Sequence, residues 1–78
     1  MDAIGPAEII RILSVTDALG IHRESVQIPL GTAGNGHARI RGRVLEIVAP
    51  RDRSFEEWLS ALAICVRALD LSPLRQAD

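Results

Sequence analysis

The chain of 78 residues contains no lysine and no tyrosine, and its only aromatic side chains are Phe55 and Trp58. Because 47% of the residues are hydrophobic, the core must consist mainly of Ile, Leu, Val and Ala. That fraction excludes a disordered chain. The length predicts a single domain over 1–78, and a domain of this size gains only about 3–5 kcal/mol of net stability from one core.

Long hydrophobic runs are also missing. No apolar stretch approaches the roughly 18–20 residues needed to cross a bilayer, and the start MDAIGPAEII lacks the basic and apolar regions of a signal peptide. Cys65 is the only cysteine, which excludes an internal disulfide. Its position in an apolar helical pattern predicts a buried, inert thiol. These features predict a cytoplasmic protein without a membrane segment.

The chain has almost no excess charge, since nine basic and ten acidic residues give a formal net charge of −1. This excludes an overall electrostatic attraction to nucleic acid. The charge is nevertheless uneven: residues 37–53 contain five of the nine arginines and only two acids, Glu46 and Asp52. The exclusive use of arginine has two interpretations, a need for its planar hydrogen-bonding fork or a coding bias.

Recognisable catalytic and metal-binding patterns are absent. His22, His37 and Cys65 have neither metal-ligand spacing nor the arrangement of a nucleophile with its base. The glycine-rich GTAGNG lies between two predicted strands, whereas a phosphate loop precedes a helix. Its GTAG part matches the short GxxG pattern of KH domains, but those domains place the pattern between helices. The sequence therefore predicts a protein that is not an enzyme and has no cofactor or metal.

An amphipathic pattern predicts a first helix at about 6–19. Pro6 suits the first helical turn, where its missing N–H has no partner in any case. The apolar side chains fall on one arc of the helix, with Ile10 as an apolar exception on the opposite side. Gly20 then provides the left-handed stop.

A second amphipathic pattern predicts a helix at about 54–71. Ser54 and Glu57 match a capping box, and Trp58 lies near the centre of the apolar arc. Pro73 prevents the residue before it from staying helical, so 72–78 is expected to be a tail.

Two alternating segments between the helices predict strands at about 24–33 and 37–48. The even-numbered residues of both segments are apolar, and directly opposed residues share a face of an antiparallel pair. The pairing therefore needs a loop with an odd number of residues, which Gly34-Asn35-Gly36 provides, with Gly36 in the left-handed conformation. This register pairs Leu30 with Ile40, Ile28 with Gly42, and Val26 with Val44.

The resulting fold class is α+β, a two-layer αββα domain in which both helices pack on one face of an antiparallel β-hairpin. The order helix, hairpin, helix is common among small bacterial and phage accessory proteins, an analogy of layout only. The expected core consists of Ile9, Ile12, Leu13, Val26, Ile28, Leu30, Ile40, Val44, Phe55, Trp58, Leu62 and Leu69.

The opposite face of the hairpin should present Arg39, Arg41 and Arg43 in a row, followed by Leu45 and Ile47. Either a β-bulge near 42–44 switches the phase and returns the last two to the core, or they form an apolar patch beside the arginines that a partner covers. Three interpretations of the row remain: a solvated face that prevents edge-to-edge association, a protein-binding or dimer face, and contacts with nucleic-acid phosphates.

The favoured function is a small non-enzymatic adaptor or regulatory protein that acts through protein–protein contacts as a homodimer. A DNA- or RNA-binding module that uses the arginine row is the alternative. Sharing core with a second copy would stabilise so short a chain. The expected dimer interface is a weaker apolar strip on the backs of the two helices, formed by Ile10, Ala61, Ile64, Ala68 and Leu71.

Overall fold

In the computed structural model, which describes residues 2–75, both predicted helices form, as α1 (Pro6–Ala18) and α2 (Phe55–Arg67). Gly20 ends α1 with a φ of 79°. Its N–H and that of Ile21 donate hydrogen bonds to carbonyls of the last helical turn, both at 3.0 Å, which is the Schellman arrangement. The prediction of an α+β protein is confirmed.

The C-terminal end of α2 differs from the prediction. The hydroxyl of Ser54 accepts a hydrogen bond from the N–H of Glu57, as expected for the N-cap, but the helix ends at Arg67 instead of 71. A further short helix, α3 (Ser72–Arg75), follows. Pro73 lies in its first turn, where the missing N–H costs nothing, so proline begins a helix here. The predicted tail is wrong for 72–75, and 76–78 lie outside the described residues.

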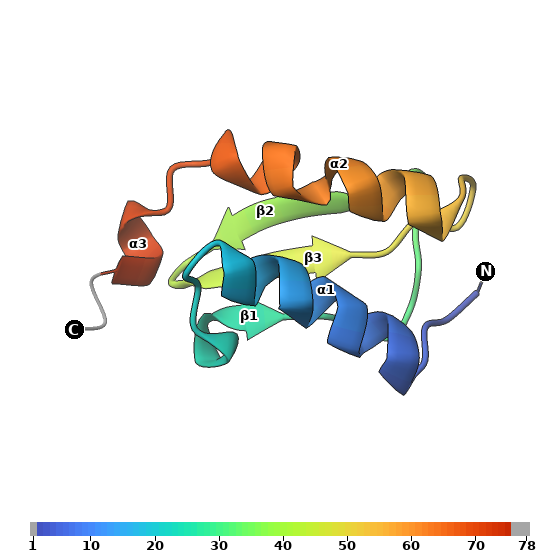
Figure 1. Cartoon of the computed structure of the whole chain (residues 1–78), viewed down its shortest axis with the longest axis horizontal. Coiled ribbons are helices and arrows are strands. Elements are labelled where there is room, and N and C mark those ends of the chain that lie inside the picture. Colours follow the sequence, from blue (N-terminus) through green and yellow to red (C-terminus); the bar gives the residue numbers. More distant parts are fainter. Residues whose placement is uncertain (1, 76–78) are drawn as a thin grey trace.

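Within residues 2–75 the strands form one mixed sheet with the order β1-β3-β2 (Figure 1). Strand β1 (Val26–Gln27) follows a short 3₁₀ helix, η1 (Arg23–Ser25), and pairs in parallel with β3 (Val44–Val48). Strand β2 (His37–Arg41) pairs antiparallel with the other side of β3. The sheet therefore has β3 at its centre.

The predicted hairpin between 24–33 and 37–48 is not formed, and its pairing register is wrong. A different hairpin forms, and it lies entirely within 37–48. Gly42 and Arg43 form its two-residue turn, between β2 and β3. Gly42 has a φ of 61°, as the first central position of a type II′ turn requires. The GTAGNG segment instead belongs to the connection that runs from β1 at one edge of the sheet to β2 at the other (Figure 1).

The turn decides which residues of 37–48 face the core. Ala38 pairs with Ile47, and Ile40 with Leu45, so even-numbered residues of β2 share a face with odd-numbered residues of β3. Leu45 and Ile47 are fully buried. Of the two alternatives expected for these residues, the structure shows their return to the core. The cause is a turn and not a β-bulge.

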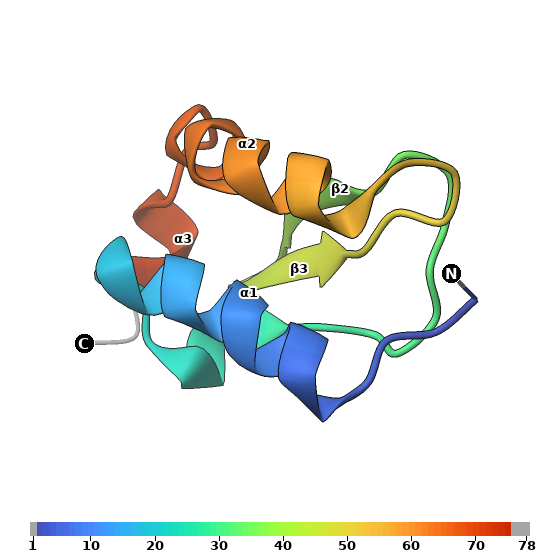
Figure 2. The same cartoon turned by 45° about the vertical axis from the view of Figure 1, so that its right-hand side comes forward.

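Both helices contribute to one core with this face of the sheet. Figure 2 shows α1 and α2 side by side, and the Arg11 guanidinium forms an ion pair with Glu56 between them. Of the expected core residues, Ile12, Trp58 and Leu62 are buried, whereas Leu30 is 58% exposed and was predicted wrongly. The expected core residues that are half-buried are Ile9, Leu13, Val26, Ile28, Ile40, Val44, Phe55 and Leu69. Buried side chains that were not expected there are Ile4, Ile21, Leu45, Ile47, Ala49, Val66 and Leu74.

Candidate protein-binding surface

The outer face of the sheet carries a row of basic side chains. His37, Arg39 and Arg41 alternate with half-buried residues along β2 and are exposed, and Arg43 is exposed in the turn that follows. The structure therefore places Arg39 and Arg41 of the predicted row on the side of the sheet away from the core, and Arg43 is exposed in the turn at the end of β2. The prediction that they face outward holds, although the register on which it was based does not.

Glu46 lies in the middle of this basic row. It is the residue of β3 directly opposite Arg39, and its side chain is only 9% exposed. The Nε of Arg39 donates a hydrogen bond to Oε1 at 2.7 Å, and an Nη of Arg41 donates one to Oε2 at 3.2 Å. The Nε2 of His37 lies 4.0 Å from the same carboxylate. Among the described residues, Arg43 has no ion-pair partner.

The two arginines stabilise the charged form of this carboxylate. The hydrogen bond from Arg39 is the main cause that lowers the pKa of Glu46, desolvation acts in the opposite direction, and Arg41 lowers the pKa further. A carboxylate whose pKa is lower in the folded than in the unfolded state stabilises the fold above its unfolded-state pKa. That contribution is lost as the pH falls through the lowered pKa of the folded state.

A strip of apolar side chains on α2 is left uncovered. Ile64 is 71% exposed, Cys65 and Ala68 are also exposed, and Ala61 is half-buried; these four residues are called the α2 strip below. At 100° per residue they lie on one flank of the helix. Glu56, which contacts α1 through Arg11, lies on the other flank, so the α2 strip faces away from α1.

The exposure of Cys65 contradicts the prediction of a buried thiol and has a structural cause. Helix α2 packs over β2, which is the last strand of the sheet on that side. The flank of α2 that points away from α1 therefore extends beyond the edge of the sheet, where the described residues provide nothing to pack against. Periodicity alone predicted burial because it cannot show where a sheet ends.

The residues expected to form a dimer interface do not make one continuous surface. Ala61, Ile64 and Ala68 belong to the α2 strip, but Leu71 is half-buried against the core. Ile10 is 59% exposed and lies on the solvent side of α1, opposite the buried Ile12. Leu45 and Ile47, expected beside the arginines if no phase change occurred, are inside the core.

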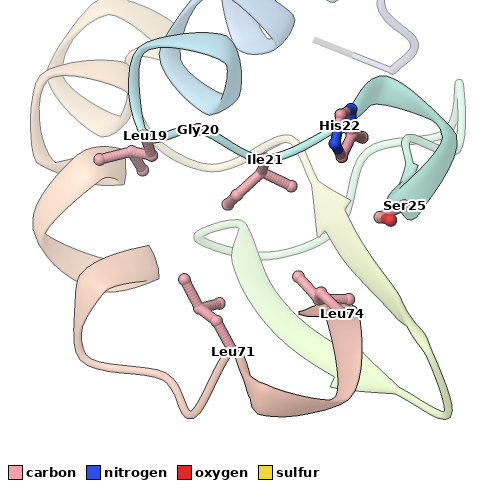
Figure 3. A pocket seen from close by; sticks show the side chains of 7 residues that line it. All are labelled: Leu19, Gly20, Ile21, His22, Ser25, Leu71 and Leu74. Carbon is pink, nitrogen blue, oxygen red and sulfur yellow. The ribbon is translucent and has the colours of Figure 1, made fainter. Parts of the chain in front are cut away.

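A small hollow lies between the end of α1, η1 and α3. Its volume is about 280 Å³. Figure 3 shows Leu71 and Leu74 on the side opposite Ile21, with His22 and Ser25 at its margin. These two supply the only polar side chains of the lining, which includes no carboxylate and is otherwise apolar apart from backbone. Sequence-based reasoning did not predict this hollow, because 72–75 was interpreted as a tail.

The other features of the described residues, and the comparisons with known proteins, do not assign a function. Residues 2–75 contain no cluster of His, Cys, Asp and Glu suited to a metal ion, and none of their helices is long and apolar enough to span a membrane. No protein-family model matches the chain, and none of the curated proteins or solved structures with which it was compared matches it either.

The sequence-based interpretation missed the role of Glu46. The signal was present in RIRGRVLE: a two-residue turn at Gly42 and Arg43 puts Glu46 directly opposite Arg39, where oppositely charged side chains attract. The error followed from treating 37–48 as one continuous strand, which left Glu46 on the core side and the arginines without a counterion.

Proposed function

We propose that the protein is a small, non-enzymatic adaptor or regulatory protein that acts through protein–protein contacts. The observation that carries this proposal is the exposed α2 strip beside the basic row of β2. Arginine next to exposed apolar side chains is typical of protein interfaces, and an uncovered apolar surface of this kind is a common sign of a binding site.

The competing function, binding of DNA or RNA, is disfavoured by Glu46. Arg39 and Arg41 both donate hydrogen bonds to its carboxylate, so a phosphate would have to compete with an internal anion for both guanidiniums. Only Arg43 in the row lacks such a partner among the described residues. Nucleic-acid affinity depends on the number of phosphates neutralised, and one free arginine in this row, on a chain of net charge −1, is too little.

Self-association is not the form of contact that the geometry favours. The dimer expected from the sequence joined Ile10 and Leu71 to the α2 strip, but Leu71 contributes to the core and Ile10 lies on another helix. The α2 strip and the basic row, by contrast, flank the same strand, β2, on its two sides. We therefore propose a different protein, and not a second copy, as the main partner.

Titration of random-sequence DNA and RNA at increasing salt tests this proposal. The wild-type protein is expected to show no submicromolar binding. Glu46→Gln is expected to bind these polyanions more tightly than the wild type, because two guanidiniums lose their internal counterion. Submicromolar, steeply salt-dependent binding by the wild type contradicts the proposal. In that case the triple change of Arg39, Arg41 and Arg43 to Ala should reduce the slope of log K against log salt by roughly 2–3 units.

A further inference from the structure

Strand β2 has one edge without a strand partner among the described residues, because β3 pairs with its other edge. In a hairpin with a two-residue turn, the residues that flank the turn exchange backbone hydrogen bonds, and the bonded pairs then alternate along the ladder. Arg41, Arg39 and His37 are therefore bonded to β3. The N–H and C=O groups of Ala38 and Ile40 point to the free edge.

The two sides of this edge differ in chemistry. On the outer side are Arg39 and Arg41, with Glu46 as the only acid that pairs with them among the described residues, and Arg43 is exposed in the turn at the end of the strand. On the inner side the α2 strip extends beyond the edge, with Ile64 71% exposed. A fourth strand beside β2 would thus have basic groups along one of its faces and apolar groups along the other.

We propose that the edge of β2 accepts an extended segment of another protein in which acidic and apolar residues alternate. This inference rests on the proposed protein-binding function and specifies its partner. Main-chain bonds to Ala38 and Ile40 hold the added strand, and alternate side chains give the specificity. Its apolar residues lie opposite Ala38 and Ile40 and contact the α2 strip. The acidic residue between them lies opposite Arg39, in a non-hydrogen-bonded pair, where side chains approach most closely.

Charge argues against a second copy of the chain at this edge. Antiparallel pairing of two β2 strands would place the arginine rows of the two copies across from each other, and like charges in directly opposed positions are destabilising. Charged edge strands are a common means of preventing such self-pairing. Glu46 supplies one negative charge against the positive charges of Arg39 and Arg41, so this face stays positively charged. An acidic strand in place of the second copy removes the repulsion and is attracted by the remaining charge. Unlike a nucleic acid, such a strand gains its affinity from main-chain bonds to β2, and the arginines only select its side chains.

Binding of a capped peptide of about nine residues with alternating Glu and Val tests the proposal. The full-length protein is titrated with this peptide and with a control in which Lys replaces Glu, and binding is followed by calorimetry and by the amide signals of β2. The Glu peptide is expected to bind at least about tenfold more tightly than the Lys peptide, a difference of about 1.4 kcal/mol. The largest shifts in β2 should be those of Ala38 and Ile40.

A matched pair of variants distinguishes binding at this site from non-specific hydrophobic binding. Ile64→Glu and Ile10→Glu each place a carboxylate at an exposed helical isoleucine, but only the first lies beside the β2 edge. Ile64→Glu should weaken the Glu peptide at least about tenfold, or by about 1.4 kcal/mol, and Ile10→Glu should leave the affinity unchanged. Ala38→Pro removes an outward-facing N–H at an edge position that tolerates proline, and should abolish binding while the circular dichroism stays native.

Three results overturn the proposal: no saturable binding of the Glu peptide at low salt, equal binding of the Glu and Lys peptides, or equal losses in the two isoleucine variants. Sedimentation that shows a dimer dissociated by Ala38→Pro also overturns it, because a second copy then occupies the edge. None of these results bears on the nucleic-acid titration, which tests the proposed function separately. A protein that binds neither the peptide nor nucleic acid retains the proposed function and loses the proposed strand.

Discussion

Trp58→Ala is expected to abolish cooperative folding at 25 °C. Trp58 is 5% exposed, and its ring centroid lies 5.6 Å from that of Phe55. Truncation of a buried Trp to Ala typically costs about 3–5 kcal/mol. One core this small rarely supplies more than about 3–5 kcal/mol of net stability. The cost therefore equals or exceeds the whole stability, and the unfolded state should become the major species. Circular dichroism and urea denaturation measure the change directly.

The matched control is Ile10→Ala. This substitution also truncates a large apolar side chain on a helix, but Ile10 is 59% exposed, and Ala has the higher helix propensity. We expect its unfolding midpoint to stay near that of the wild type. A Trp58→Ala variant that unfolds cooperatively at the same midpoint as Ile10→Ala would contradict the central position of Trp58 in the core.

Gly36→Ala is expected to destabilise the protein more than Gly34→Ala. Both glycines have positive φ, 75° and 48°, so both variants incur the left-handed penalty of roughly 1–2 kcal/mol. A Cβ at Gly34 meets nothing within 4 Å, whereas a Cβ at Gly36 would lie 2.7 Å from the Nε1 of Trp58 and 3.0 Å from the backbone N of Pro50. The backbone atom cannot rotate away, and such overpacking costs a further 1–3 kcal/mol or so.

Urea denaturation of the two glycine variants measures this difference, because the left-handed penalty is common to both and largely cancels. Equal free energies of unfolding for the two variants would mean that the chain between β1 and β2 does not pass this close to Trp58. The comparison therefore tests the path of the connection that sequence-based reasoning interpreted as a hairpin turn.

The helices were predictable because their signals are local. Pro6, Gly20 and the Ser54 N-cap act within one turn of the chain, and each does so in the structure. The apolar arc of α2 correctly identified Trp58 and Leu62 as buried. The same pattern wrongly predicted that Cys65 is buried, because burial on that flank of α2 depends on how far the sheet extends beneath the helix.

The strand pairing was not predictable in the same way, because it depends on which turn closes. Two turns competed in the sequence, one at Gly34-Asn35-Gly36 and one at Gly42-Arg43. A parity argument for the first was sound only if 37–48 was a single strand. The change of apolar phase between Ile40 and Leu45 was the sign of a reversal, and it was interpreted as a bulge or a patch. A one-residue change in register moves every side chain to the other face.

The candidate site was predicted in part. Alternation within β2 puts Arg39 and Arg41 on the same face in any register, and their charge favours the solvent side of the sheet. The Glu46 ion pairs and the free edge of β2 depend on the strand order, and no local pattern encodes it. The apolar residues of the site come from α2, where Ile64 was predicted to lie in a dimer interface on the back of the helix and Cys65 was predicted to be buried.

Residue-resolved amide hydrogen exchange of the free protein tests the central claim, that β2 presents one open edge between the arginine row and the α2 strip. The amides of Arg39 and Arg41, bonded to β3, should be protected, whereas those of Ala38 and Ile40 should exchange at rates near those of an unstructured peptide. This alternation should persist as the protein concentration is lowered. Protection of all four amides would contradict the account, because a strand of this chain or of a second copy would then occupy the edge.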